Sequence, residues 1–299
     1  MAIHPDAQAL LDRYESLGAK PLRDLGVIRA RAAVATSVEF AGPKEKVDSI
    51  VDDVIEAHDR AIPIRRYRSS PEPKATILYL HGGGWVAGDV ATADPACRAL
   101  ANASNCEVVS VEYRRSPETR YPGPLEDAAC VLRTITTSSK GPLFVAGDSA
   151  GGGLAASLAF IARDESIPLT GQILLYPAID PQTSFGDPDA GQTSGLSRGD
   201  MAFFWNNYLG DAMQGQGYAA PLLIEDVSGL APALIISAEI DILRDENERY
   251  VVKLGDAGCS VIHVIAAGMI HGFFWQFGAV PTARRCLTSI SEFIDTRLS

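Results

Sequence analysis

Cysteine is scarce and without pattern in this chain of 299 residues. The five cysteines form no Cys-x-x-Cys pair and are odd in number: Cys97, Cys106, Cys130, Cys259 and Cys286. Such usage is typical of free thiols in a reducing compartment, not of a disulfide framework. The chain also lacks a His-Glu-x-x-His motif and clustered Cys and His residues, so the sequence implies no metal and no organic cofactor.

Long hydrophobic runs and an excess of positive charge are absent as well. No apolar run approaches the ~20 residues that span a membrane, and the start of the chain lacks the basic and apolar regions of a signal peptide. A net charge of −11 disfavours a surface that binds phosphates. We therefore expect a cytoplasmic protein that binds neither nucleic acid nor membrane. The sequence leaves its oligomeric state, monomer or homodimer, open.

Short apolar runs alternate with amphipathic stretches from about residue 47 onward. Runs typical of strands are 51–57, 62–67, 75–80, 107–113, 143–147, 170–176, 233–237 and 261–265, with a hairpin turn expected at 58–61. Helical patterns cover 92–103, 124–136, 154–162, 246–255 and 283–297. This alternation predicts an α/β fold with a mostly parallel central sheet flanked by helices.

Two segments depart from this alternation. Residues 1–45 contain two short amphipathic patterns, 4–16 and 21–33, which fit either a packing role or part of a cap over a site. Residues 180–220 are rich in Gly, Pro, Asp, Ser and Gln around one aromatic helical patch at 201–208. An insertion of this length between strands is usually a lid or another functional loop.

One stretch carries a candidate nucleophile. The run 143–147 leads into Gly147-Asp148-Ser149-Ala150-Gly151, and a helical pattern follows at once. Strand, Gly-x-Ser-x-Gly and helix is the sequence form of a nucleophile elbow, in which a strained turn exposes the serine hydroxyl. Side chains at the two flanking glycines would collide with the neighbouring strand and helix. The pentapeptide alone occurs by chance in roughly one chain in ten, so the alternative is a glycine-rich turn with an idle serine.

A serine nucleophile needs a base and a carboxylate that orients the base. His271 is favoured as the base because it lies in a loop after the last predicted strand. The other histidines lie in the N-terminal segment, a turn, a glycine run and an apolar strand, where a core position is expected: His4, His58, His81 and His263. Asp241 is the favoured acid since it follows a strand and lies between Ser149 and His271, with Glu239 and Asp245 as competitors.

The run His81-Gly82-Gly83-Gly84 follows another predicted strand and is typical of an oxyanion hole, which is built from backbone N–H groups. The same glycines match a loosened dinucleotide-binding fingerprint, Gly82-x-Gly84-x-x-Ala87. That fingerprint must open a helix directly, whereas residues 85–89 have the composition of a loop. The oxyanion hole is therefore the favoured interpretation.

In these motifs the chain resembles the hormone-sensitive-lipase-like esterases of the α/β-hydrolase fold, in the branch that carries Gly-Asp-Ser-Ala-Gly. The resemblance covers about residues 75–275 and rests on these motifs: His81 to Trp85, Asp94-Pro95, Tyr113-Arg114, Pro117-Glu118, Gly147 to Gly152, Leu175 to Pro177, Asp241 to Glu246 and His271 to Phe273. Two positions depart from the family pattern: Ile242, where proline is usual, and Ser116, where alanine is usual.

The resemblance implies Ser149, Asp241 and His271 as a catalytic triad. It implies an oxyanion hole formed by the backbone N–H groups of Gly83, Gly84 and Ala150. It also implies a cap, built from residues 1–45 and about 180–215, on a catalytic domain of residues 46–299. Under such a cap, the residues expected to line the substrate pocket are Trp85, Phe203, Phe204 and Phe273.

The expected function is that of a serine carboxylesterase, which hydrolyses small-molecule esters of short- to medium-chain acids through an acyl-enzyme. An acyltransferase would use the same triad and is the main alternative. A non-catalytic small-molecule receptor on this fold is the second alternative. Plant gibberellin receptors resemble this family but lack the triad histidine, which this chain retains as His271.

Overall fold

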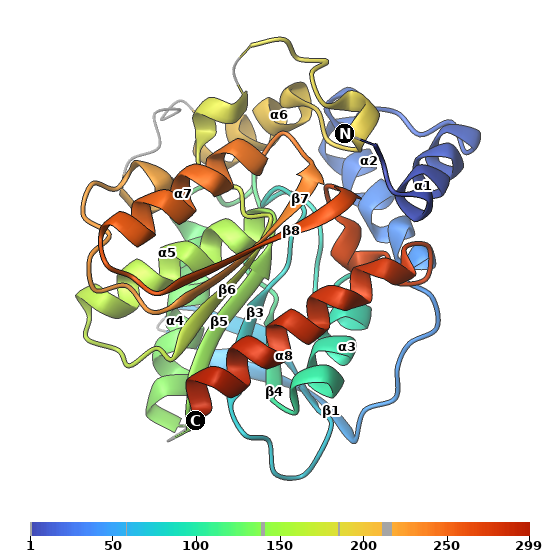
Figure 1. Ribbon diagram of the computed structural model, residues 1–299. Helices are drawn as coiled ribbons and strands as arrows, with labels where there is room; N and C mark the ends of the chain where they lie inside the picture. The colour runs from blue at the N-terminus through green and yellow to red at the C-terminus, as the bar shows by residue number, and fades with distance from the viewer. Residues whose placement is uncertain (1, 58, 139–140, 185, 211–216) are drawn as a thin grey trace.

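The computed structural model describes residues 2–57, 59–138, 141–184, 186–210 and 217–299 (Figure 1). Within these residues eight strands form one sheet, in the order β1-β2-β4-β3-β5-β6-β7-β8. The strands are β1 (Ser49–Glu56), β2 (Ala61–Arg68), β3 (Thr76–Leu80), β4 (Glu107–Val111), β5 (Leu143–Asp148), β6 (Gly171–Leu175), β7 (Ala233–Ile240) and β8 (Val261–Ile270). Strand β2 pairs antiparallel with β1 and β4, and the other pairs are parallel. The predicted mostly parallel sheet is confirmed.

The four central strands, β3 to β6, are buried at every residue. Their near-continuous apolar runs are what a parallel sheet covered on both faces requires. Strand β8 lies at an edge of the sheet and continues five residues beyond the predicted end at residue 265. The extension contains Ala266, Ala267 and Gly268, residues with little strand propensity, and it forms because β7 offers a partner up to Ile240.

Helices cover both faces of the sheet (Figure 1). One face carries α3 (Asp94–Ser104) and α8 (Arg285–Leu298), and the other carries α4 (Gly123–Ser138), α5 (Ala150–Asp164) and α7 (Arg244–Asp256). Each face has its own hydrophobic core, and successive strand residues alternate between the two, as Phe144 and Val145 do. The sheet therefore holds the ends of its strands in fixed positions.

Three further helices gather at one end of the molecule: α1 (Pro5–Ser16), α2 (Leu22–Thr36) and α6 (Arg198–Leu209) (Figure 1). Helix α1 meets the end of β8, where the His4 N–H donates to the Gly268 carbonyl over 2.9 Å. The helix expected over 21–33 is broken at Gly26, whose φ of 69° lies outside the helical region. The aromatic patch forms α6, which begins with a capping box between Ser197 and Asp200.

Two expected features extend beyond the described residues. These are residue 58 of the hairpin turn and residues 185 and 211–216 of the insertion. The five cysteines are free thiols, and Cys97, Cys106 and Cys286 are buried. Across the described ranges, no helix combines the length and the hydropathy that membrane crossing demands.

Candidate active site

Ser149 occupies the turn between β5 and α5. Its φ of 53° and ψ of −122° place it in a region that side-chain-bearing residues rarely adopt. The Ser149 N–H donates to the Leu175 carbonyl over 2.9 Å, and its own carbonyl accepts from Gly153 and Ala178, each over 3.0 Å. Such angles persist only where the surroundings over-determine them. The strained turn expected at this serine is present.

The two glycines that flank the serine leave no room for a side chain. A Cβ atom on Gly147 would lie 2.3 Å from the Gly151 carbonyl oxygen. A Cβ atom on Gly151 would lie 2.0 Å from the carbonyl oxygen of Leu80, at the end of β3. Both contacts are with backbone, which cannot turn aside as a side chain can. The predicted collision with the neighbouring strand and helix is confirmed.

His271 and Asp241 meet at Ser149 from the ends of β8 and β7. The Nε2 atom of His271 lies 2.8 Å from Ser149 Oγ, and its Nδ1 atom lies 2.7 Å from Asp241 Oδ2. The second Asp241 oxygen accepts from the Leu243 N–H over 3.0 Å. With Asp241 ionised, the Nδ1 atom carries the proton, so Nε2 can accept the proton of the serine hydroxyl. The Asp241 side chain is fully buried, and that of His271 is 11% exposed.

The competing acids have other partners or positions. Glu239 accepts from the Gly268 N–H over 2.7 Å, so its carboxylate is bound to the backbone of β8. Asp245 lies in the first turn of α7, where a negative charge favours the helix dipole. The structure therefore brings Asp241, and neither competitor, to the His271 ring.

The side chains of the other described histidines contact residues other than Ser149. His81 is buried and stacks on Tyr113 with ring centroids 4.2 Å apart, and burial lowers its pKa to about 4. His263 is half-buried on β8, with Nε2 2.9 Å from Ser237 Oγ, so it is less enclosed than the expected core histidine. His4 caps α1 by accepting from the Asp6 N–H.

The glycine run after β3 forms a tight loop. Three consecutive residues have positive φ: Gly83 at 111°, Gly84 at 63° and Trp85 at 59°. The Gly83 carbonyl accepts from the N–H groups of Val86 and Ala87, which turns the loop back on itself. A Cβ atom at Gly83 would lie 2.2 Å from the Ala87 carbonyl oxygen, so glycine is required there.

Asp148 joins this loop to the serine turn. Its buried carboxylate accepts from the Tyr79 hydroxyl over 2.7 Å and from the Gly82 N–H over 3.0 Å. The Gly82 N–H is therefore already engaged. Burial raises the pKa of Asp148 to about 6, and the two hydrogen bonds oppose that rise. We did not predict this contact from the sequence, although an acidic residue that ends a buried apolar strand is a signal for one.

The four residues expected to line the substrate pocket separate into two pairs. Phe204, on α6, lies directly on Gly84: a Cβ atom there would be 2.1 Å from the Phe204 ring. Phe203 is partly exposed and packs edge-on against Phe204. That Trp85 and Phe273 line the substrate pocket stays a prediction. They are 1% and 0% exposed, because neighbouring aromatic rings cover them: Tyr208 stacks on Trp85, and Tyr176 packs on Phe273.

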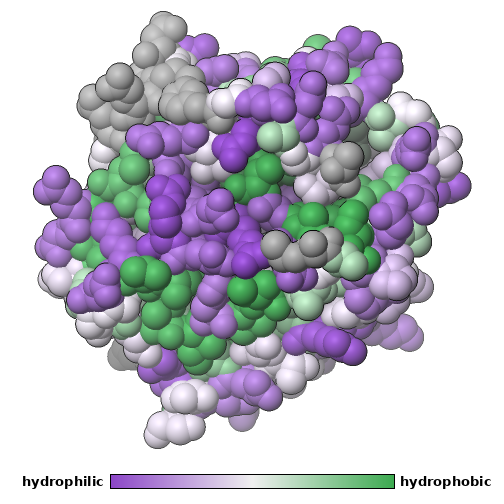
Figure 2. All heavy atoms as spheres, turned by 45° about the horizontal axis from the view of Figure 1, so that its top comes forward, coloured by the Kyte–Doolittle hydropathy of each residue, from purple (hydrophilic) through white to green (hydrophobic). Residues whose placement is uncertain are grey.

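The N-terminal segment and the insertion are linked through Arg23, at the start of α2. Its guanidinium donates to the Pro188 carbonyl over 2.9 Å and to Ser197 Oγ over 2.7 Å, and it also pairs with Asp189. The Arg23 N–H donates to Asp200. The sequence analysis missed this link, since the partners are more than 160 residues apart in the chain. Figure 2 views the molecule with the end that carries α1, α2 and α6 tilted toward the reader. On this face hydrophobic residues form separate patches among polar ones.

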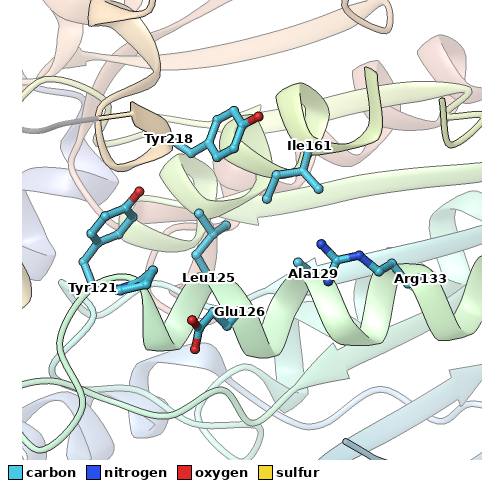
Figure 3. Close-up of a pocket in the computed structure, with 8 residues that line it drawn as sticks. Tyr121, Leu125, Glu126, Ala129, Arg133, Ile161 and Tyr218 are labelled. Atoms are coloured by element: carbon cyan, nitrogen blue, oxygen red, sulfur yellow. The ribbon is translucent and has the colours of Figure 1, made fainter. Parts of the chain in front are cut away.

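Two surface hollows lie away from Ser149. One, of about 180 Å³, lies between α4 and α5 beside Tyr218 (Figure 3). The other, of about 400 Å³, is lined by Asp245, Glu248, Arg249 and Val252 of α7. Neither lining includes Ser149, Asp241 or His271.

In the described part of the chain, no group of three or more His, Cys, Asp or Glu side chains is arranged to hold a metal ion.

Comparison with known proteins places this geometry in a family context. Residues 77–275 match the model of a family with the α/β-hydrolase fold. The carboxylic ester hydrolase LipN of Mycobacterium tuberculosis is 36% identical over 92% of this chain and 78% of its own. The ethyl acetate hydrolase of Pseudomonas putida is 30% identical, with 100% of both chains covered. A thermostable esterase from Pseudomonas putida superposes with a TM-score of 0.91, at 33% identity over 100% of this chain and 98% of that one.

Proposed function

Because the chain belongs to the α/β-hydrolase fold family and is a carboxylic ester hydrolase of its hormone-sensitive-lipase-like group, we propose that Ser149 is the nucleophile of its reaction. The observation that carries this proposal is the hydrogen-bonded series from Asp241 through His271 to Ser149, with distances of 2.7 and 2.8 Å. In that series each group can act on the next in the way that acyl transfer requires. The proposal also assigns the chain to the branch that carries Gly-Asp-Ser-Ala-Gly.

The first half of the reaction forms an acyl-enzyme. Ser149 Oγ bonds to the ester carbonyl carbon while its proton passes to His271 Nε2, and the carbonyl π electrons move to the oxygen. Asp241 stabilises the imidazolium that results. The N–H groups of Gly83, Gly84 and Ala150 donate to the oxyanion, and each such donor contributes roughly 3 kcal/mol to transition-state stabilisation. The carbonyl then re-forms, the bond to the alcohol oxygen breaks, and His271 protonates the departing alcohol.

The second half of the reaction releases the acid. A water molecule gives a proton to His271 Nε2 as its oxygen attacks the acyl carbon, and the same backbone donors bind the second oxyanion. Collapse of this intermediate breaks the bond to Ser149 Oγ, which recovers its proton from the His271 imidazolium. The net reaction consumes one ester and one water and yields one acid and one alcohol, with no cofactor.

We assign the role of a cap to residues 1–45 and about 180–215, with Phe203 and Phe204 over the acyl side of the site. The contact of Phe204 with Gly84 supports this assignment, since it places α6 on the glycine loop. Each buried methylene favours binding by roughly 0.8 kcal/mol until the space is filled. Rates should therefore rise from acetyl to roughly butanoyl or hexanoyl esters and then fall. The name of one relative, ethyl acetate hydrolase, agrees with a short acyl group.

The test is the rate of hydrolysis of p-nitrophenyl esters of increasing acyl length by the wild type and by Ser149→Ala. Loss of the nucleophile should lower kcat by several orders of magnitude and leave the melting temperature nearly unchanged. A variant that kept more than about a tenth of the wild-type rate would reveal another nucleophile. Adding an alcohol and comparing ester with acid among the products separates hydrolysis from acyl transfer.

A further inference from the structure

A guanidinium group from the N-terminal segment reaches the backbone of the glycine loop. Arg31, on α2, donates through Nε to the Val86 carbonyl over 2.8 Å and through Nη2 to the Ser116 carbonyl over 3.0 Å. Val86 and Ser116 are both fully buried. A buried carbonyl without a donor is costly, so these bonds fix where Val86 and Ser116 can lie relative to α2.

The segment that Arg31 contacts begins with a strained residue. Trp85 has a φ of 59°, and it lies between Gly84 and Val86. Its carbonyl accepts from the Ser116 N–H over 2.9 Å. The loop is thus held to Ser116 twice, once directly through Trp85 and once through the Arg31 guanidinium, which bridges Val86 and Ser116. Strained backbone of this kind needs such over-determination to persist.

Glu118 holds the Arg31 fork in position. The two side chains form a bidentate pair, with Nη1 2.9 Å from Oε1 and Nη2 2.6 Å from Oε2. The guanidinium hydrogen bonds lower the pKa of Glu118 to about 2. Because the Glu118 side chain is 62% exposed, its attraction to Arg31 is largely screened by water, and its main effect is to orient the planar guanidinium.

We propose that Arg31 is a positioning residue for ester hydrolysis. It holds the backbone that follows Gly83 and Gly84 in the conformation in which their N–H groups stabilise the oxyanion. This inference rests on the proposed function, since it matters only if those two N–H groups bind the oxyanion. Through Arg31, the N-terminal segment would then contribute to transition-state stabilisation, in addition to its proposed role as a cap.

The experiment compares Arg31→Ala with Arg29→Ala, which removes an exposed arginine bonded to the Leu25 carbonyl of the same helix. For each variant, kcat and KM are measured on p-nitrophenyl butanoate. Two inhibitors with the same propyl chain are also measured: a trifluoromethyl ketone and the corresponding secondary alcohol. Ser149 Oγ adds to the ketone carbon, its proton passes to His271, and the resulting oxyanion needs the backbone donors. The alcohol forms no oxyanion.

We expect Arg31→Ala to lower kcat about tenfold with KM within about twofold, because it loosens donors that act in the transition state. Inhibition by the trifluoromethyl ketone should weaken by a similar factor while inhibition by the alcohol stays unchanged. Arg31→Lys should recover part of the loss, since an ammonium group reaches one carbonyl but cannot reproduce the fork. Arg29→Ala should match the wild type, and Glu118→Gln should stay within about threefold because the bonds from Arg31 to the backbone remain.

A folded Arg31→Ala with wild-type kcat and wild-type ketone inhibition overturns the inference, and so does an equal weakening of both inhibitors, which indicates general disorder of the site. If Arg31→Ala does not fold, Arg31→Lys decides by the same two measurements. Failure of the proposed function has a different signature. If the proposed function is wrong, Ser149→Ala keeps its activity. If only the inference about Arg31 is wrong, Ser149→Ala is inactive and Arg31→Ala behaves like the wild type.

Discussion

The two sides of the candidate active site are held in place by different kinds of bonds. On the sheet side, Ser149, Asp241 and His271 each follow a strand, and inter-strand backbone bonds fix where those strands end. On the side of the proposed cap, Arg23 and Arg31 carry the links from α2 to the insertion and to the glycine loop. The sheet side is therefore specified by the fold as a whole, whereas the cap side depends on individual side chains.

This difference predicts how each side responds to substitution. A change at a triad residue or at a glycine of the serine turn should either stop the chemistry or disrupt the fold, because the triad groups react directly and a Cβ atom at these glycines meets backbone. A change on the cap side should alter rate or selectivity by modest factors, since other contacts between the helices remain. The four predictions below test this difference in descending order of effect.

The largest effect is expected at Asp241. Asp241→Asn should lower kcat by about 10⁴, because an amide favours the wrong tautomer of His271. The control is Glu239→Gln, which keeps an oxygen that can accept from the Gly268 N–H and should be mild. Steady-state kinetics on one ester ranks the two variants. The reverse ranking would assign the orienting role to Glu239, and Asp241 would then not be part of the triad.

The next effect concerns stability on the sheet side. Gly151→Ala places a Cβ atom 2.0 Å from the Leu80 carbonyl oxygen, and we expect a loss of about 3 kcal/mol in the free energy of unfolding. Gly255→Ala is the matched control, since a Cβ atom there meets nothing within 4 Å and lies on α7. It should stabilise the protein by about 0.5–1 kcal/mol through helix propensity. If urea unfolding gave the two variants the same free energy of unfolding, the claim that steric contact requires glycine at position 151 would be contradicted.

A third prediction concerns Glu246, which links the two sides. Its buried carboxyl accepts from the Ile179 N–H over 2.7 Å and from the Thr183 hydroxyl, at the start of the insertion. Burial raises its pKa from 4.5 to about 8, while the hydrogen bonds oppose that rise. The folded state thus retains a proton that the unfolded chain loses. The contribution to stability is full below about pH 4.5 and falls as the pH rises toward 8.

Glu246→Gln should remove this dependence, because glutamine resembles the protonated acid in shape and stays neutral. Relative to the wild type, the variant should gain a few kcal/mol in the free energy of unfolding between pH 5 and pH 8.5, because only the wild type loses a proton on unfolding. Urea unfolding at both pH values measures the difference. A difference that stays constant with pH would show that Glu246 is ionised in the folded protein.

The smallest effect is expected at Arg23. Arg23→Ala removes bonds from α2 to Pro188 and Ser197, which should loosen the proposed cap and weaken its limit on acyl length. The decanoyl-to-butanoyl rate ratio should rise about fivefold, roughly 1 kcal/mol, with little change for the acetyl ester. Arg29→Ala again serves as the control. An unchanged profile would argue against a cap role for the N-terminal segment. It would do so more cleanly than a deletion, which would also remove the buried Ala7 and Leu10.

The sequence predicted the sheet side well because its signals are local. Buried parallel strands appear as continuous apolar runs, and the elbow glycines are required by contacts a few residues away or in the next strand. The order of Ser149, Asp241 and His271 along the chain follows from the order in which strands join an α/β-hydrolase sheet. The ends of β7 and β8 were misjudged: β7 runs three residues and β8 five residues beyond the predicted ends, and the small residues in the β8 extension carry no strand signal.

The cap side could not be predicted in the same way, because its contacts join residues far apart in the chain. Nothing near Arg23 or Arg31 indicates that their partners lie at 188–200 and 86–118. The contacts of the expected pocket residues could not be predicted from the sequence either. An aromatic patch indicates burial, but the sequence does not show that Phe204 faces Gly84 while the ring of Trp85 is covered by Tyr208.

The contact between Gly84 and Phe204 fixes the order in which these two positions can vary. Any residue other than glycine at 84 would place its Cβ atom against the Phe204 ring, and it would also have to accept a φ of 63°. A smaller residue at 204 removes the first obstacle and leaves the second. In laboratory evolution, position 204 is thus the permissive first step. A library that randomises position 84 in the parent sequence samples almost entirely inactive or unfolded variants.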